Sequence, residues 1–198
     1  MAISASTVKQ LRDKTGIGMM DCKKALEESG GDMEKAVEVL RKKGMAAADK
    51  RAGRAVGQGF IGSYIHTDGK IGVMVELNCE TDFVARNEEF RALARDIAMH
   101  VAWSNPLALD RAGVPAGIIE KERSIYAEQV KGKPANIVER IVDGKMGKFF
   151  EERCLLEQAF VKDPDKKIED LVTEMSRKTG ERIVVKRFSR FAVGEETT

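Results

Sequence analysis

Side chains suited to covalent catalysis or metal binding are scarce in this sequence of 198 residues. It contains two histidines, His66 and His100. Its three cysteines are Cys22, Cys79 and Cys154, whose odd number and wide spacing form neither a CxxC pair nor a metal-binding pattern. Such cysteines are typical of reduced, partly buried thiols. We therefore expect neither a bound metal nor a cofactor, and little scope for catalysis by histidine.

An excess of one charge and long apolar runs are also absent. The 34 Lys and Arg residues nearly balance the 32 Asp and Glu residues, for a net charge of +2. This balance gives no general case for binding nucleic acid or a membrane surface. No apolar run approaches the length of a membrane span, and residues 1–14 lack the apolar core of a signal peptide. We therefore expect a cytoplasmic protein that binds neither membranes nor nucleic acid directly.

Glycine-rich and acidic segments form no recognisable catalytic motif. The glycines of residues 53–62 precede a predicted strand, whereas a phosphate-binding loop joins a strand to a helix. Gly144 and Gly147 lack the lysine and following Ser or Thr of such a loop, and would loosen the predicted helix that contains them. Glu151 and Glu152 lie among lysines and arginines, where a solvated helix face is expected. The sequence therefore predicts a protein that is not an enzyme.

Three short amphipathic helices are predicted in the first part of the chain. Apolar residues recur at helical spacing at Val8, Leu11, Ala25, Leu26, Ala36, Val37 and Leu40. Asp32 is a candidate N-cap for the third helix, and Lys42 and Lys43 in its last turn complement the helix dipole. Residues 45–59 are rich in alanine, then in basic residues and glycine, which is typical of a helical extension passing into a linker. We predict a helical domain and linker at residues 1–54.

An α+β domain is predicted for residues 55–198. Asp68 and Gly69 lie between two runs of alternating apolar residues and indicate a hairpin. A helix capped by Asn87 follows, and further helices are predicted over residues 118–133 and 134–160, with a turn and then another helix within residues 162–180. Residues 181–193 alternate as a closing strand. These elements predict a small antiparallel sheet with helices packed on one side.

Two segments place apolar side chains where water is the expected neighbour. In residues 15–22, TGIGMMDC, the side chains of Ile17, Met19 and Met20 crowd a turn between two predicted helices. They either pack into the helical bundle or form an exposed contact surface, since methionine adapts readily to a partner. The sequence leaves both interpretations open.

The second segment is residues 80–87, ETDFVARN, between a predicted strand and a predicted helix. Such a connection is normally short, polar and on the surface, yet it carries Phe83 and Val84. Spacing alone favours Phe83 packed beneath the following helix, with Thr81 or Asp82 as an N-cap. The alternative is an exposed aromatic that contacts another protein.

Long segments of the sequence resemble elongation factor Ts. They are residues 11–44, 75–90 and 149–163 and the closing strand, in the same order over nearly the whole chain. The resemblance implies a guanine-nucleotide exchange factor that binds elongation factor Tu carrying GDP. It also implies a ubiquitin-associated-like bundle of three helices followed by a core of sheet and helices. Longer family members carry a second core half and a helical hairpin insert, whereas this chain has a single core repeat.

The resemblance also implies two contact regions. The first, the wedge, comprises Thr81, Asp82, Phe83 and Val84. Phe83 would enter an apolar cleft between helices of the nucleotide domain of elongation factor Tu, and Asp82 would meet polar groups beside it. This contact would disturb the magnesium site and promote release of GDP. The second region, the knob, would anchor the wedge on the same domain and comprises Leu11, Arg12, Ile17, Met19 and Met20.

A homodimer through the core domain is expected for two reasons. Both faces of the closing strand carry apolar side chains, and nothing else in the sequence is available to cover the second face. In addition, short members of the family look like homodimers that restore the pair of core halves.

Two other functions fit part of the sequence. A helical adaptor without exchange activity would use the three-helix bundle to bind a helix or a ubiquitin-like protein. An RNA-binding protein would use residues 50–54, KRAGR, and residues 186–191, KRFSRF, where basic residues alternate with Phe188 and Phe191. An ordinary strand with one apolar face explains the second motif better, because the net charge is weak.

Overall fold

The computed structural model describes residues 3–15, 17–51 and 53–195, apart from the side chains of residues 44–50. The chain divides into two compact units. The first contains Met1–Gly59, Asn78–Phe90 and Val172–Val184, and the second contains Phe60–Leu77, Arg91–Leu171 and Val185–Thr198. The sequence predicted a boundary between residues 54 and 55 that separates two independently folding domains. That boundary stays a prediction.

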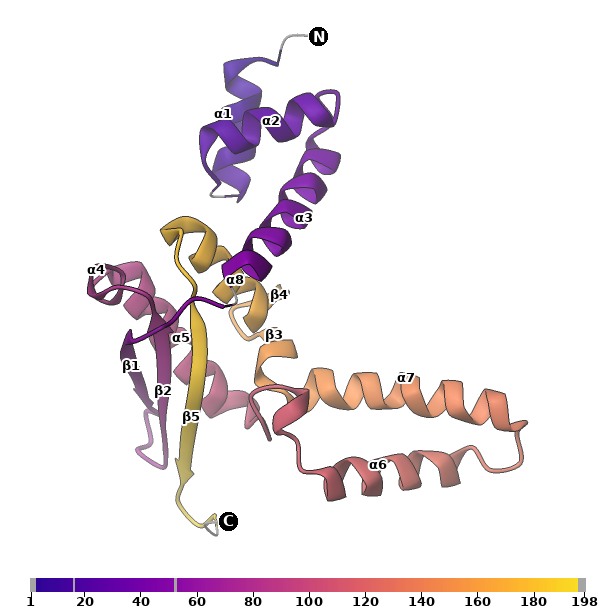
Figure 1. Ribbon diagram of the computed structural model, residues 1–198. Helices are drawn as coiled ribbons and strands as arrows, with labels where there is room; N and C mark the ends of the chain where they lie inside the picture. Colours follow the sequence, from indigo (N-terminus) through magenta and orange to yellow (C-terminus); the bar gives the residue numbers. More distant parts are fainter. Residues whose placement is uncertain (1–2, 16, 52, 196–198) are drawn as a thin grey trace. The chain divides into compact units, whose positions relative to one another are not determined.

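Three helices begin the first unit: α1 (Ala5–Thr15), α2 (Met19–Glu28) and α3 (Met33–Arg51) (Figure 1). Their apolar stripes meet in a common core, formed by Val8, Leu11, Cys22, Ala25, Leu26, Ala36 and Leu40. Between α2 and α3, Gly30 and Gly31 have φ angles of 64° and 89°, which reverse the chain at little steric cost. The predicted helices, and the helical extension through the alanine-rich segment, are confirmed.

A three-stranded antiparallel sheet lies mainly in the second unit, in the order β1 (Gln58–Ile65), β2 (Ile71–Cys79) and β5 (Val184–Ala192). Helix α5 (Glu88–Ser104) runs along one face of this sheet (Figure 1). Gly62 permits the close approach, because a Cβ atom there would lie 2.5 Å from the backbone carbonyl of Ala94. The α+β class and the small antiparallel sheet packed by helices are confirmed.

Caps predicted from the sequence occur at two helix starts. The Oδ1 atom of Asp32 accepts the backbone N–H groups of Glu34 and Lys35, both at 3.0 Å. The bond from Lys35 is the main reason why the pKa of the Asp32 carboxyl lies below its ordinary value, because it favours the charged form. At the start of α5, the Oδ1 atom of Asn87 accepts the N–H of Glu89 at 2.8 Å. Local side-chain chemistry therefore fixes where α3 and α5 begin.

Helices α6 (Ala116–Gln129) and α7 (Ala135–Arg153) form an antiparallel hairpin in the second unit (Figure 1). Val142 and Met146 are buried within it. Helix α7 continues through Gly144 and Gly147, so the predicted loosening there is wrong. A Cβ atom at either glycine would meet no described atom within 4 Å, so both lie on the open side while the other side packs. A helical hairpin, which the resemblance associates with longer family members, thus occurs in this chain.

Helix α7 ends at Arg153, whereas the sequence predicted a helix as far as residue 160. A 3-10 turn (Leu155–Glu157) follows, and then strand β3 (Ala159–Phe160), which pairs with β4 (Asp163–Lys167). The N–H groups of Leu155 and Leu156 donate to the carbonyl oxygens of Ala108 and Leu109 at 2.9 and 3.0 Å. These bonds to a distant segment replace helical ones, so tertiary pairing overrides the local pattern. Helix α8 (Ile168–Thr179) then follows as predicted.

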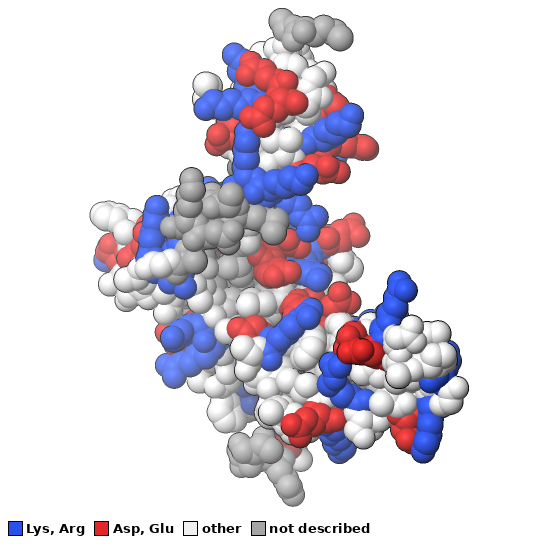
Figure 2. Space-filling model, turned by 45° about the vertical axis from the view of Figure 1, so that its right-hand side comes forward, with Lys and Arg blue, Asp and Glu red and all other residues white. Residues whose placement is uncertain are grey.

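Charged side chains of both signs are interspersed on the surface that Figure 2 shows. No extended area of one sign is visible among the described residues of this face, in agreement with the net charge of +2. Within the described part of the chain, no helix combines the length and the apolar composition that crossing a membrane requires.

Candidate functional site

A four-residue helix, α4 (Asp82–Ala85), carries most of the wedge. Thr81 precedes it with extended backbone angles, φ −124° and ψ 157°, and its Oγ1 atom accepts the N–H of Val84 at 3.5 Å. The cap is therefore Thr81, one of the two predicted residues, and Asp82 is the first residue of the helix. A helix this short gains little from its own hydrogen bonds, so its orientation depends on what holds its ends.

Phe83 projects into solvent with 83% of its surface exposed. The interpretation that it packs beneath the following helix is therefore wrong. Ala85 takes the inward position of α4 and is 8% exposed, and it lies about 200° around the helix from Phe83. The buried aromatic near the start of α5 is instead Phe90, which is fully enclosed. The exposed ring is therefore accessible to a partner, and aromatic side chains are frequent anchors of protein interfaces.

Asp82 and Val84 flank this ring. The Asp82 Oδ2 atom pairs with Nη2 of Arg86, one helical turn further on, at 3.0 Å. Both of these charged side chains reach solvent, so the pair contributes little stability and leaves the carboxylate accessible. Val84 is half-buried. The wedge thus presents an aromatic ring and a carboxylate side by side along the chain.

Two glutamates hold the start of α4. Glu80 lies just before this helix, and Glu181 lies 101 positions further along the chain. The Oε2 atom of Glu181 accepts the backbone N–H groups of Glu80 and Thr81 at 2.9 and 3.1 Å, and its Oε1 atom accepts the Thr81 hydroxyl at 2.5 Å. In return, Oε1 of Glu80 accepts the N–H of Arg182 at 2.6 Å and an Arg54 guanidinium N–H at 3.2 Å. The bond from Arg182 is the main cause that lowers the pKa of the Glu80 carboxyl. We call Glu80, Thr81, Glu181 and Arg182 the clamp.

Cys79 lies directly before the clamp and is completely buried. Its Sγ atom donates to the Thr81 carbonyl oxygen at 3.2 Å. Burial raises the pKa of the thiol to about 11, and the negative charge of Glu181 adds to this effect. The thiol is therefore protonated at neutral pH and is no nucleophile. Cys22 and Cys154 are also free and buried, as the sequence predicted.

The knob residues differ in exposure. Leu11 is fully enclosed in the bundle core, so its side chain supports the knob and cannot itself contact a partner. Ile17 is half-buried against the same core. Met19 and Met20 at the start of α2 are 42% and 66% exposed, and Arg12 lies at the surface of α1. Both interpretations of this turn therefore hold in part: Ile17 packs, and the methionines face solvent.

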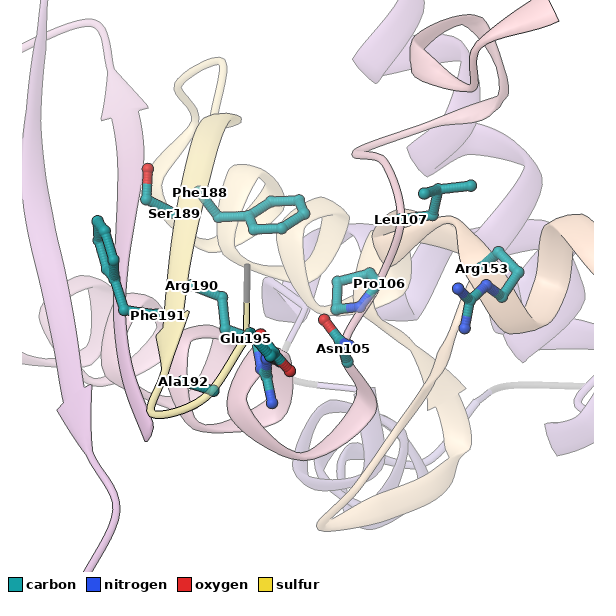
Figure 3. A pocket seen from close by; sticks show the side chains of 10 residues that line it. All are labelled: Asn105, Pro106, Leu107, Arg153, Phe188, Ser189, Arg190, Phe191, Ala192 and Glu195. Atoms are coloured by element: carbon teal, nitrogen blue, oxygen red, sulfur yellow. Dashed lines mark hydrogen bonds and ion pairs between the residues drawn. The ribbon is translucent and has the colours of Figure 1, made fainter. Parts of the chain in front are cut away.

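A cavity of about 450 Å³ lies beside β5 in the second unit (Figure 3). Arg190 borders it and donates to both carboxylate oxygens of Glu195 at 2.7 and 2.6 Å, which neutralises its charge. Phe188 and Phe191 project from opposite sides of the strand (Figure 3). The two rings therefore cannot form one stacking surface, which argues against RNA binding through residues 186–191.

The arrangement is suited to contact and not to covalent chemistry. Among the described residues, no group of three or more His, Cys, Asp and Glu side chains is placed to hold a metal ion. The His66 Nδ1 atom lies 3.1 Å from the Tyr64 hydroxyl on the exposed hairpin. His100 is buried with Nε2 3.0 Å from Oε1 of Gln158, and burial lowers its pKa. Each histidine thus has a structural hydrogen bond of its own.

Comparison with known proteins identifies the family. Residues 23–195 match the family model described as elongation factor TS. The chain belongs to the elongation factor Ts family. It is 62% identical over 196 residues to elongation factor Ts of Thermodesulfovibrio yellowstonii, which covers 98% of each chain. It is 59% identical over 196 residues to that of Desulfotalea psychrophila, covering 98% of this chain and 100% of the relative. Identity to that of Thermotoga petrophila is 56% over 195 residues, covering 98% of both.

Membership establishes the function at the level of the family. The chain is a nucleotide exchange factor for elongation factor Tu in translation, and it is not an enzyme. The family acts in the bacterial cytoplasm. The near-complete coverage of relatives of similar length confirms the short form that the resemblance implied.

Proposed function

We propose that the wedge and the knob are the two regions through which this chain binds elongation factor Tu and releases GDP. The exposure of Phe83 carries the proposal, because a ring that is 83% exposed on a capped turn is free to become the buried aromatic anchor of an interface. Phe83 enters an apolar cleft between helices of the nucleotide domain, and the accessible Asp82 carboxylate meets polar and backbone groups beside it. The displaced helices weaken the magnesium site, and GDP leaves.

The knob supplies affinity rather than disturbance. Met19 and Met20 present polarizable, flexible side chains at the start of α2, and Arg12 adds a charge on α1. Leu11 and Ile17 hold these residues from within the bundle. Contacts that persist with and without GDP raise affinity for both states of the partner and leave the exchange step itself unchanged.

Release of labelled GDP from elongation factor Tu, measured at increasing concentrations of this chain, separates the two roles. Met20→Ala should raise the half-saturating concentration with little change in the maximal rate, because it removes binding common to both states. Changes in the wedge should lower the maximal rate. Ile125→Ala, at a residue 41% exposed on α6, is the control. A lower maximal rate for Met20→Ala, or an equal effect of the control, would contradict this division.

We also propose that the chain forms a homodimer through the sheet face opposite α5. Because Gly62 faces α5, its neighbours Ile61 and, further along, Ile65 point away from that helix. Met74 and Phe191 add to the same face from β2 and β5, and the four side chains are 50–66% exposed. A Cβ atom at Gly72 would lie 3.1 Å from Cδ1 of Ile65, so neighbouring strands contribute to one surface.

Two such faces packed about a two-fold axis would bury this surface and leave one elongation factor Tu bound per chain. Light scattering over micromolar concentrations tests the proposal. The parent chain should show about twice the monomer mass of 21.9 kDa. Ile65→Asp should bring the mass down to that of the monomer, whereas Ile125→Asp on the hairpin should not. A parent mass near 21.9 kDa at every concentration would exclude the dimer.

A further inference from the structure

In the described part of the chain, the carboxylate of Glu181 bonds to the two residues that precede α4. Both of its oxygens accept hydrogen bonds there, from the N–H groups of Glu80 and Thr81 and from the Thr81 hydroxyl. The same hydroxyl oxygen accepts the N–H of Val84 as the cap of α4. One side chain therefore connects directly to the first turn of the helix that carries Phe83.

Glu181 is itself fixed before it reaches the wedge. Gly180 has a φ angle of 74°, which turns the chain after α8. The N–H of Glu181 donates to Oγ1 of Thr179 at 3.3 Å, and its carbonyl oxygen accepts the hydroxyl of the buried Ser176 at 2.5 Å. Glu80 reinforces the junction in the opposite direction, through the N–H of Arg182. Hydrogen bonds therefore fix both the segment that carries Glu181 and the segment that precedes α4.

A helix of four residues does not hold its own direction, because too few hydrogen bonds close within it. The bonds from Glu181 restrict residues 80 and 81 and so restrict the direction in which Phe83 projects. A side chain presented in its docking orientation loses less conformational entropy when it binds. Without these bonds, only a fraction of the molecules hold Phe83 in the orientation that can dock. The contribution of the wedge is then reduced in proportion to that fraction.

We infer that Glu181 is a positioning residue for nucleotide exchange, which holds the wedge in its docking orientation through residues 80 and 81. The inference rests on the proposed role of Phe83. Glu181 acts through the hydrogen bonds that orient residues 80 and 81, and its negative charge is not required. A Gln side chain keeps the length and an acceptor oxygen for the two N–H groups, whereas an Asp side chain keeps the charge and is one methylene shorter.

The test compares Glu181→Ala, Glu181→Gln and Glu181→Asp in the labelled-GDP release assay with the full chain. Glu181→Ala and Glu181→Asp should lower the maximal rate by about tenfold, the factor expected when the competent orientation falls to roughly one-tenth. Glu181→Gln should stay near the parent rate. Glu128→Ala, which removes an exposed carboxylate paired with Lys131 on the hairpin, is the control and should leave the rate unchanged. Retention by Asp with loss in Gln would show a charge contact and overturn the inference.

A double-mutant cycle with Phe83→Ala separates positioning from general destabilisation. If Glu181 acts through the wedge, Glu181→Ala should slow release little further once Phe83 is gone. Multiplying effects would overturn the inference, as would amide hydrogen exchange at residues 80 and 81 that is no faster in Glu181→Ala. If Phe83→Ala alone leaves release unchanged, the proposed wedge itself fails. If Phe83→Ala slows release and Glu181→Ala does not, only the role of Glu181 fails. Should Glu181→Ala not fold, the order of the Gln and Asp variants decides.

Discussion

Replacement of Phe83 by alanine should have little effect on the free chain and a large effect on the complex. In the free chain the ring is 83% exposed, so its removal takes almost nothing from the core. The free energy of unfolding should therefore change by less than about 0.5 kcal/mol, as for other surface substitutions. In the complex, full burial of a Phe side chain contributes roughly 1.5–3 kcal/mol. If that burial is completed only as GDP leaves, its loss slows stimulated release by about 10- to 150-fold, at 1.36 kcal/mol per factor of ten.

The assay is the rate of fluorescent GDP release from elongation factor Tu at saturating concentrations of the chain, with thermal unfolding measured in parallel. Trp103→Ala is the matched control, because Trp103 is another aromatic residue, 70% exposed, on α5. It should leave both the release rate and the melting temperature close to those of the parent. A melting temperature that falls sharply in Phe83→Ala while release continues at the parent rate would refute the reasoning, since it would mean that the ring supports the fold.

Three further perturbations test other parts of the chain. Removal of residues 1–54 should leave a folded core that binds elongation factor Tu much more weakly, measured by circular dichroism and GDP release; unchanged release at low concentration would contradict a role for the knob. The pKa of Glu80 lies below its ordinary value of 4.5, so its carboxylate stabilises the fold above that pH and this contribution is lost as the pH falls through the lowered value. Denaturant titrations of the parent and Glu80→Gln should therefore converge in acid, and a gap independent of pH would oppose this. Gly62→Ala should lower the free energy of unfolding by about 1–3 kcal/mol, because it overpacks β1 against Ala94, whereas Gly57→Ala, with no described atom within 4 Å of the added Cβ, should not.

Features set by neighbouring residues could be predicted from the sequence. Asp32 and Asn87 cap their helices because the acceptor and the N–H groups it binds lie two or three residues apart. The hairpin at Asp68 and Gly69 follows from a local turn, in which Gly69 has a φ angle of 68°. In each case the groups that form the feature lie within a few residues of one another, so the local sequence is sufficient to predict it.

Features set by distant residues could not be predicted in this way. The end of α7 depends on backbone bonds from Leu155 and Leu156 to residues 108 and 109, and the apolar pattern beyond Arg153 still resembles a helix. The clamp joins residues 100 positions apart, and nothing in the sequence around Glu181 marks its carboxylate as an acceptor for the wedge. Phe83 shows the same limit, because its spacing favours a packed residue, whereas the structure exposes the ring to solvent.

The energetics of exchange explain why a single exposed ring is insufficient and why its support matters. A nucleotide bound at nanomolar affinity is held by about 12 kcal/mol, several times what burial of one Phe contributes. The exchange factor therefore has to bind the nucleotide-free partner more tightly than the GDP form, and GDP weakens the factor by the same ratio. In the proposed mechanism, loss of the magnesium contacts supplies part of this difference. The ring contributes to the rest of this free-energy difference most effectively when α4 already holds one orientation. A mobile α4 would lose conformational entropy on docking, and that loss would offset part of the contribution of the ring. Under the proposed mechanism, the exposure of Phe83 and the hydrogen bonds that hold Thr81 are therefore both required.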